Sequence, residues 1–307
     1  IVNLLLIVSA ILLSIIVNVF AQKYFLRKKK VVEINSRSSH SEISTNSGGI
    51  SIFICVFFLS VLLYLNGIEI FDYKIFVPIS LMTLIGLYDD LYDVDFKLKL
   101  IFQVVTAKII VDHGFIIDNL HGVFGIFELS AIYAQLLTVF IIVSIINSIN
   151  FIDGIDGLAL AVISIFLISF EFFGKNFFFF DSLSLLLICS TIPLWYFNFK
   201  KNKKIFLGDA GSLMLGTVVS IYTISILKSH YIIKDDYDIH KILFVISILL
   251  YPIIDIIRIF FLRVINGQSP FVADKRHIHH LLLNVFKSHF TVTLIISLFT
   301  LFFIVLV

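Results

Sequence analysis

The sequence predicts an all-α polytopic integral membrane protein with about ten transmembrane helices and both termini outside. Hydrophobic residues make up 59% of its 307 residues and charged residues only 14%, and the mean hydropathy is +1.06. A water-soluble domain is about 45–50% apolar and about 25% charged, so a chain of this composition requires lipid around it. The length accommodates a single transmembrane domain, residues 1–307, with spans of roughly 20 residues each.

Ten apolar stretches separated by polar connections are the expected spans. The first stretch lacks a basic start and a small-residue cleavage site, so we expect a span and not a signal peptide. Several stretches are shorter than a full span, so the polar connections beside them should dip toward the bilayer. The stretches are residues 1–20, 50–66, 75–88, 99–112, 131–147, 158–173, 178–197, 211–228, 242–262 and 290–307.

Basic residues are distributed unequally between the two sets of connecting loops. One set carries 16 Lys and Arg residues, and the opposite set carries 5. Because cytoplasmic loops accumulate Lys and Arg, the richer set is expected in the cytoplasm, which places both termini outside. The cytoplasmic set comprises the loops near residues 21–49, 89–99, 147–157, 198–210 and 263–289.

Two adjacent carboxylates, Asp89 and Asp90, end the third stretch. Adjacent carboxylates repel each other unless a cation or a proton lies nearby. The pair therefore suits a metal, another bound cation or a general base, although a solvated helix end would also explain it. Lys99 opens the next stretch and is either a phosphate ligand or an anchor at the cytoplasmic boundary.

Four polar side chains recur at every third residue where the fifth stretch ends: Asn147, Asn150, Asp153 and Asp156. Residues three apart are neighbours on a helix, so these side chains form one polar stripe. Glycines at 154 and 157 let the backbone break or approach a ligand closely. The remaining alternative is a loop with ordinary turn residues.

A glycine-rich segment, Gly208-Asp209-Ala210-Gly211-Ser212, directly precedes the eighth stretch. A turn of this kind presents free N–H groups at a helix N-terminus, which suits phosphate. Asp209 offers oxygen ligands of the type that Mg²⁺ prefers. Helix capping by Asp209 or Ser212 is the structural alternative.

The last cytoplasmic loop holds a cluster of nitrogen-bearing side chains: Arg276, His277, His279 and His280, after Asp274 and Lys275. This composition resembles an anion or sugar site more than a zinc site, because no Cys and no H-E-x-x-H pattern is near. A plain basic loop is the alternative interpretation.

Other polar residues of the apolar stretches receive structural interpretations. Asp255 and Arg258 are three residues apart, so an ion pair within one helix is the default expectation. Cys55 and Cys189 lie in apolar runs and are expected to be small buried hydrophobes.

All four polar clusters fall in the loops assigned to one membrane face. Membrane proteins keep ionisable groups near hydrocarbon for function, and carboxylates with cations match a phosphoryl-transfer site. A secondary transporter would place such groups near the midplane at a repeat interface, whereas these clusters lie at span ends. A non-catalytic scaffold would not need four clusters on one face.

These motifs resemble the polyprenyl-phosphate N-acetylhexosamine-1-phosphate transferases, glycosyltransferase family 4, which also contains the phospho-N-acetylmuramoyl-pentapeptide transferase. The resemblance extends from Arg37-Ser-Ser-His40 through Gly48-Gly49 to the histidines. One departure is that the Pro usual before this glycine pair is absent. The matching segments, in order, are residues 86–90, 147–159, 208–212 and 277–280.

The resemblance implies transfer of an N-acetylhexosamine 1-phosphate, with N-acetylglucosamine favoured by the His-Ile-His-His form, from a UDP-sugar to undecaprenyl phosphate. UMP would be released and a lipid-linked cell-envelope polysaccharide initiated. The expected location is the bacterial inner membrane with a cytoplasmic active site. The muramoyl-pentapeptide donor is the alternative. Membrane lipid is a partner, a homodimer stays open, and no nucleic acid is expected.

The resemblance also assigns roles to individual residues. Asn150 and Asp209 would hold Mg²⁺ or Mn²⁺, and Asp89 and Asp90 would be catalytic. The His277–His280 segment and Arg276 would meet the sugar-phosphate end, with His279 and His280 in the catalytic group. The remaining substrate-binding residues would be Lys99, Asn147, Asp153 and Asp156.

Overall fold

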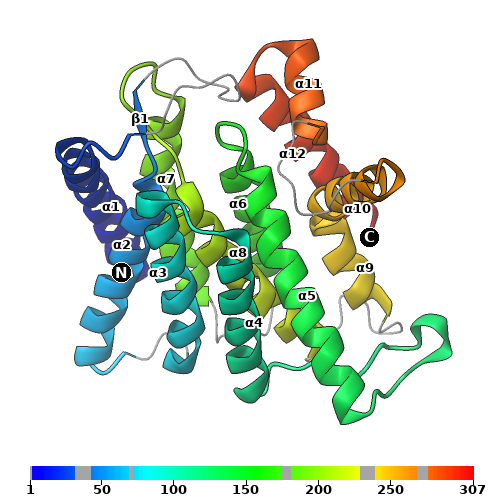
Figure 1. Cartoon of the computed structure of the whole chain (residues 1–307). Coiled ribbons are helices and arrows are strands. Elements are labelled where there is room, and N and C mark those ends of the chain that lie inside the picture. Colours follow the sequence, from blue (N-terminus) through cyan, green and yellow to red (C-terminus); the bar gives the residue numbers. More distant parts are fainter. Residues whose placement is uncertain (1, 32–42, 69–71, 174–180, 229–238, 268–275) are drawn as a thin grey trace. The chain divides into compact units, whose positions relative to one another are not determined.

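The ten apolar stretches form α-helices in the computed structural model, one each except for the ninth stretch, which forms two. The structure describes residues 2–31, 43–68, 72–173, 181–228, 239–267 and 276–307. Figure 1 shows the helices in chain order. Their bounds are α1 Val2–Arg27, α2 Gly48–Leu65, α3 Phe76–Tyr92, α4 Phe96–Asp112, α5 Ala131–Ile152, α6 Leu158–Phe173, α7 Asp181–Phe199, α8 Gly208–Lys228, α9 Ile239–Ile248, α10 Leu250–Ile265, α11 Ile278–Phe286 and α12 His289–Leu306.

Six helices of the described chain are long and apolar enough to cross a membrane: α1, α2, α8, α5, α12 and the segment Tyr73–Tyr92 that contains α3. The ninth expected span is broken, because α9 and α10 are bent by 72° at Leu249 and would count as a seventh span together. Helices α6 and α7 are apolar but shorter. The protein is therefore an all-α multi-pass membrane protein, while the count of ten spans and the sides of the termini stay predictions.

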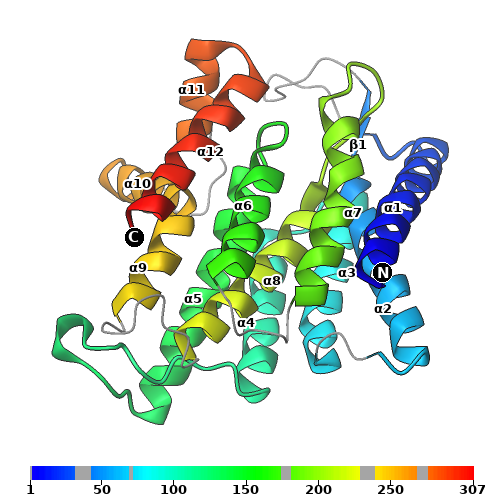
Figure 2. The ribbon, with the colours of Figure 1, turned by 180° about the vertical axis from the view of Figure 1, so that it is seen from behind.

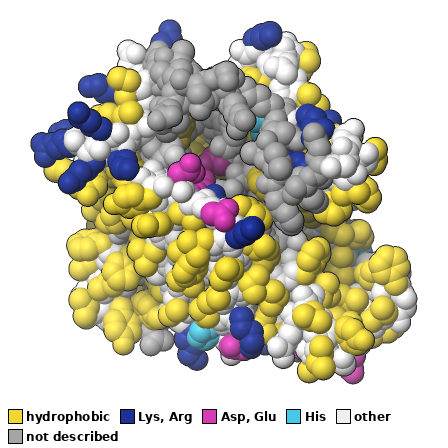
Figure 3. Space-filling view, in the orientation of Figure 1, with side chains coloured by type: hydrophobic (Ala, Val, Ile, Leu, Met, Phe, Trp, Pro, Cys, Tyr) yellow, Lys and Arg dark blue, Asp and Glu magenta, His cyan; other side chains and the backbone are white. Residues whose placement is uncertain are grey.

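Large hydrophobic side chains are exposed on the helices, as expected for surfaces that lipid covers. On α5, Leu136 is 64% exposed and Phe140 is 68% exposed. Figure 3 shows hydrophobic side chains across much of the viewed surface. The two cysteines are buried and free, which confirms their prediction as small hydrophobes.

The described residues fall into two compact units, which we treat separately. The first comprises the chain up to Val94 together with Leu167–Leu215, and the second comprises Asp95–Phe166 together with Gly216–Val307. In the first unit α1, α2 and α7 pack against one another, and Figure 2 shows α1 and α7 from behind. The hydroxyl of Ser14 donates to the carbonyl of Ser190 at 2.6 Å, which links α1 to α7.

A short parallel sheet closes one end of the first unit. Strand β1 (Ser44–Thr45) pairs with β2 (Lys204–Ile205), with Ser44 opposite Lys204. The backbone then continues this pairing, since Gly48 N donates to Phe206 O and Gly49 N donates to Leu207 O. The sheet therefore brings the N-terminus of α2 to the N-terminus of α8.

The second unit is built around α4 and α5, with α9, α10, α11 and α12 beside them. An antiparallel hairpin, residues 113–130, connects α4 to α5 and contains a 3₁₀ turn at Val123–Gly125. Inside the unit, Gly216 lies against α5, where a Cβ would come within 2.9 Å of Ile146 Cα. A small residue is thus required at this helix contact, as in many membrane helix pairs.

Candidate functional site

The predicted site residues form two clusters, one in each unit. The first cluster surrounds the N-terminus of α8 and contains Asp89, Asp90 and Asp209. The second contains the histidines of the last loop, the turn at residues 153–157 and the end of α5. The segments Arg37–His40 and Asp274–Lys275 lie outside the described residues.

The carboxylate of Asp90 caps helix α8. Its Oδ1 accepts hydrogen bonds from the backbone N of Asp209 at 3.0 Å and from Nδ2 of Asn46 at 2.9 Å. Its Oδ2 accepts from the backbone N of Ala210 at 2.9 Å. The first N–H groups of a helix lack intrahelical partners and carry the positive end of the helix dipole. A carboxylate from α3 therefore fixes the first turn of α8.

Glycines bring the backbones around Asp209 into direct contact. A Cβ on Gly86 would lie 2.3 Å from the carbonyl oxygen of Asp209, and a Cβ on Gly49 would lie 2.0 Å from the backbone N of Gly211. Both distances are far below van der Waals contact, so only glycine fits at these two places. The glycine pair after β1, which the sequence left without a role, thus seats α2 against α8.

Asp89 and Asp209 complete the acidic cluster of the first unit. Oδ1 of Asp89 accepts a hydrogen bond from the backbone N of Val94 at 2.6 Å, which holds the chain at the end of α3. Asp209 is in the first turn of α8 and is half-buried. A cation lies nearby, since Lys30 Nζ donates to the carbonyl of Leu91 and sits 4.8 Å from the ring centre of Tyr92.

The acidic cluster fits a divalent metal that takes some of its ligands from the protein and the others from a substrate. Among the residues that the structure describes, no three His, Cys, Asp or Glu side chains gather closely enough to hold a metal by themselves. Mg²⁺ is usually bound by one or two carboxylates plus substrate phosphates and water. Asp209, in a first helical turn fixed by Asp90, supplies a carboxylate of this kind.

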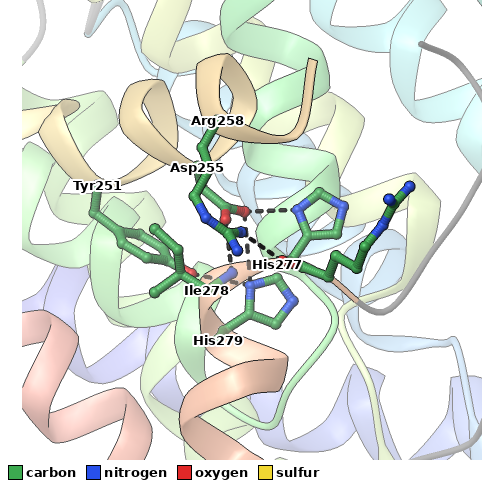
Figure 4. Close-up of polar contacts among 7 residues, drawn as sticks. Tyr251, Asp255, Arg258, His277, Ile278 and His279 are labelled. Carbon is green, nitrogen blue, oxygen red and sulfur yellow. Dashed lines mark hydrogen bonds and ion pairs between the residues drawn. The ribbon is translucent and has the colours of Figure 1, made fainter. Parts of the chain in front are cut away.

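In the second unit, Asp255 holds the start of α11. Its Oδ2 accepts a hydrogen bond from Nδ1 of His277 at 2.7 Å, and its Oδ1 accepts from the backbone N of Ile278 at 2.7 Å (Figure 4). Asp255 is 1% exposed and His277 is 6% exposed. The bond places the His277 proton on Nδ1, so Nε2 is the ring nitrogen that does not bond to Asp255.

The default expectation for Asp255, an ion pair with Arg258, is wrong. Arg258 donates from Nη1 to the backbone carbonyl of Arg276 at 2.5 Å, while the Asp255 carboxylate bonds to the His277 segment (Figure 4). Because both side chains of α10 reach the loop before α11, one helix face positions the histidine segment. Asp255 and Arg258 therefore both bond to residues at the start of α11 and not to each other.

His279 is buried and held by Tyr251. The Tyr251 hydroxyl and His279 Nδ1 are 2.9 Å apart, and the His279 side chain is fully buried (Figure 4). Burial and the neighbouring His280 lower the pKa of His279 to about 3, so its imidazole is neutral at ordinary pH. Its Nε2 is buried and has no hydrogen-bond partner among the described residues.

The turn after α5 lies against these histidines. A Cβ on Gly154 would come within 2.8 Å of His279 Nε2 and 3.3 Å of His280 Nε2. The predicted Asp153–Asp156 segment and the His277–His280 segment therefore meet, although they are far apart in sequence. His280 is half-buried, which makes it the more accessible of these two histidines.

Two of the predicted polar residues are tied to partners that the sequence did not reveal. Asn147 and Gln103 exchange amide hydrogen bonds, with Asn147 Nδ2 donating to Gln103 Oε1 at 2.7 Å. The backbone N of Asp156 donates to Nδ1 of His289 at 3.0 Å. A polar Gln inside the apolar α4 was the available signal for Gln103, whereas His289 stood alone and gave none.

The remaining predicted residues are all half-buried and belong to the second unit: Lys99, Asn150, Asp153 and Arg276. Side chains with this exposure are accessible to a ligand. The structure thus gathers Asp89, Asp90 and Asp209 in one unit, and it gathers the polar end of α5 with the histidines in the other.

The fold and its two clusters define a class: a multi-pass α-helical membrane protein with carboxylate and histidine clusters at helix ends, suited to phosphate chemistry. Comparison with known proteins narrows this class. The model of glycosyl transferase family 4 matches residues 72–227, which include Asp89, Asp90, the α5 stripe and Asp209. The chain belongs to this family.

Curated relatives align over most of the chain. A Bacillus subtilis protein named "Probable undecaprenyl-phosphate N-acetylglucosaminyl 1-phosphate transferase" is 33% identical over 95% of this chain and 80% of its own length. The undecaprenyl-phosphate alpha-N-acetylglucosaminyl 1-phosphate transferase of Haemophilus influenzae is 32% identical over 81% of this chain and 70% of its own. The Salmonella typhi protein of that name is 28% identical over 92% and 76%.

Proposed function

We propose that this chain transfers N-acetylglucosamine 1-phosphate from UDP-N-acetylglucosamine to undecaprenyl phosphate and releases UMP. The observation that carries the proposal is the placement of Asp209 in a helix turn capped by Asp90, beside Asp89. Relatives with this named acceptor and sugar align over most of the chain. The product would be a lipid-linked sugar that begins a cell-envelope polysaccharide.

The reaction joins two phosphates that repel each other. We favour direct displacement over a two-step route through an Asp phosphoryl-enzyme. An oxygen of the lipid phosphate attacks the β-phosphorus of the donor, a new P–O bond forms, and the bond from the β-phosphorus to the bridging oxygen breaks. The electron pair leaves with UMP. Holding both reactants in place removes much of the entropic part of the barrier. A divalent ion, when bound, supplies charge stabilisation on the phosphate oxygens.

Individual residues have proposed roles that follow from their environment. Asp209 and Asn150 are the proposed metal ligands. We propose that Asp90 acts through Asp209, because both of its oxygens accept hydrogen bonds from the N-terminus of α8 and Asn46. Asp89 remains the proposed catalytic carboxylate, and Lys99 the proposed phosphate ligand.

We propose that the histidine segment binds the sugar-phosphate end of the donor. His280 is half-buried and Arg276 is half-buried, so both can meet a ligand. Imidazole and guanidinium groups donate to sugar and phosphate oxygens. His277 and His279 are buried and held by α10, so in this proposal they place His280 and Arg276.

We also propose that the site faces the cytoplasm of a bacterial inner membrane, where the soluble donor is available. The bias of Lys and Arg toward one set of loops supports this orientation. The described members of the two clusters belong to that set of loops or to the helix ends beside it.

The proposal is tested with purified protein, undecaprenyl phosphate, Mg²⁺ and a panel of UDP-sugars, following UMP release. We expect release with UDP-N-acetylglucosamine or a close amino-sugar relative and none with UDP-N-acetylmuramoyl-pentapeptide. UMP release that occurs only with the muramoyl-pentapeptide donor would contradict the proposed substrate. Absence of release with every donor would contradict the transferase activity.

A further inference from the structure

The α4–α5 hairpin, residues 113–130, is a rigid projection with an apolar tip. Backbone hydrogen bonds join its two strands, including Leu120 N to Phe127 O at 2.7 Å and Gly122 N to Ile126 O at 3.0 Å. Its tip, residues 122–127, reads Gly-Val-Phe-Gly-Ile-Phe and has no charged side chain. Phe124 is 94% exposed and Phe127 is 63% exposed.

The base of the hairpin is fixed to the second unit. The backbone N of Ile117 donates to Oγ1 of Thr138 on α5 at 2.9 Å, and Ile117 is 2% exposed. His121 Nε2 is 2.9 Å from the carbonyl oxygen of Leu227 at the end of α8. Hydrogen bonds at the base therefore fix the position of the hairpin and of the aromatic side chains at its tip.

Phe124 has an unfavourable backbone conformation at the tip of the hairpin. Its φ is 55° and its ψ is 22°, in the left-handed region. Bulky residues rarely adopt this conformation, which favours Gly and Asn. An aromatic side chain that is almost fully exposed at such a position gains nothing by packing within the chain. The backbone hydrogen bonds of the turn, such as Gly125 N to Gly122 O at 2.9 Å, hold this conformation and leave the ring exposed.

The tip is joined by a short link to the beginning of a candidate membrane span. Phe127 is four residues before the first residue of α5, a candidate membrane span, so it is at most about 14 Å from that residue. Figures 1 and 2 show the hairpin extending sideways from the beginning of α5, not onward along the helix axis. The headgroup region is several ångströms thick on each side of the hydrocarbon core.

The start of α5 exposes apolar side chains as the tip does. Ile132, Tyr133 and Leu136 in its first two turns are 71%, 68% and 64% exposed. A helix span presents such residues to lipid, and aromatic side chains concentrate at the membrane boundary. Exposed apolar side chains thus lie both at the tip and at the start of the span, with the exposed Glu128 and Ser130 between them.

From these observations we infer that the α4–α5 hairpin is a membrane anchor, whose Phe124, Ile126 and Phe127 insert into the lipid interface beside α5. The inference rests on the membrane location of the chain and not on its catalytic activity. The anchor fixes the beginning of the helix whose other end carries Asn147 and Asn150. The alternative partner for the apolar tip is a second copy of this chain, and the test distinguishes that contact from contact with lipid.

Tryptophan fluorescence tests the anchor directly, because Trp195 is the single tryptophan of the chain. In a Trp195→Phe background, Phe124→Trp and Phe127→Trp are each reconstituted in phosphatidylcholine vesicles with and without brominated acyl chains. Leu136→Trp on α5 provides the lipid-facing reference, and Lys201→Trp, in an exposed polar loop, provides the aqueous reference. Iodide is present on both sides of the vesicle membrane, because this loop and the hairpin are expected on opposite faces.

We expect brominated lipid to quench Trp at 124 and 127 at least half as strongly as Trp at 136, with several-fold less quenching by aqueous iodide than at 201. Quenching by iodide equal to that at 201, without quenching by brominated lipid, would overturn the inference. Protection from both quenchers, together with crosslinking of a Phe124→Cys variant between chains, would assign the tip to a second copy and also overturn it. Two tryptophan positions ensure that one poorly folded variant does not decide the result.

Discussion

Oδ1 of Asp90 accepts a hydrogen bond from the backbone N of Asp209 at 3.0 Å, so one member of the acid pair holds the residue proposed to bind the metal. The other oxygen accepts from the next backbone N, that of Ala210, at 2.9 Å. The carboxylate therefore holds the first turn of α8, and this structural role can be tested separately from any role in the reaction.

We expect Asp90→Asn to lower both stability and turnover. The Asn amide retains one acceptor oxygen and turns an NH₂ toward backbone donors, which should cost about 1–2 kcal/mol. Thermal unfolding in detergent, measured beside UMP release, checks this. Asp93→Asn is the matched control, because Asp93 is an exposed acid at the end of α3. A large loss of turnover in Asp90→Asn with no change in Tm would show that Asp90 acts on the substrate instead.

Chelation should abolish turnover, and Mg²⁺ or Mn²⁺ should restore it. Charge stabilisation by a bound metal contributes several kcal/mol, and each 1.4 kcal/mol is tenfold in rate. We therefore expect Asp209→Asn to reduce turnover by about a hundredfold or more while Tm changes little. Direct metal binding, measured by calorimetry on the wild-type protein and on Asp209→Asn, gives a readout independent of turnover. Full activity in EDTA would refute the metal role of Asp209 and Asn150.

The buried His279 should make stability depend on pH. Above its unfolded pKa of about 6.5, His279 is neutral in both states and its contribution is complete. Between that value and the folded pKa of about 3, only the unfolded state binds the proton, so stability falls as pH falls. We expect Tm to drop more between pH 7.5 and 5 in the wild-type protein than in His279→Gln. Equal slopes in the two proteins would contradict a neutral, buried His279.

Substitutions of His280 and His279 should differ in their effects on turnover and on stability. His280 is half-buried and His279 is fully buried against Tyr251. We expect His280→Ala to lower turnover at least tenfold with little change in UDP affinity or Tm, and His279→Ala to lower turnover and Tm together. Turnover, UDP binding by calorimetry and thermal unfolding distinguish the two. Equal loss of UDP affinity and turnover in His280→Ala would place it in the nucleotide site.

The apolar helices could be predicted because each follows from a local run of apolar residues, whereas α11 lies in a segment that was expected to be a loop. Even the short stretch at residues 99–112 forms a helix, α4, which begins at Phe96. Apolar residues continue through the break at Leu249, so hydropathy did not reveal it, and Pro252 in the first turn of α10 was the local signal. The break separates α9 from α10 and sets the direction of the face that holds Asp255 and Tyr251.

The sequence also singled out four polar clusters, because polar residues are conspicuous beside apolar spans, and their roles in the site stay predictions. Their partners were not predicted, since pairing over long sequence distances leaves no local pattern. Asp255 was assigned to Arg258, its near neighbour, and bonds instead to His277. Gly49 gave no signal of its contact with Gly211, which exists only once α2 and α8 are packed.

The most direct measurement follows the β-phosphate of the donor. UDP-N-acetylglucosamine carrying ³²P in the β-phosphate is incubated with the purified chain, undecaprenyl phosphate and Mg²⁺, and the label is traced into the lipid and nucleotide fractions. The account predicts that the label enters the lipid pyrophosphate while unlabelled UMP is released in equal amount. Label that stays in the aqueous fraction, under conditions where the Bacillus subtilis relative transfers it, would contradict the proposed phosphosugar transfer.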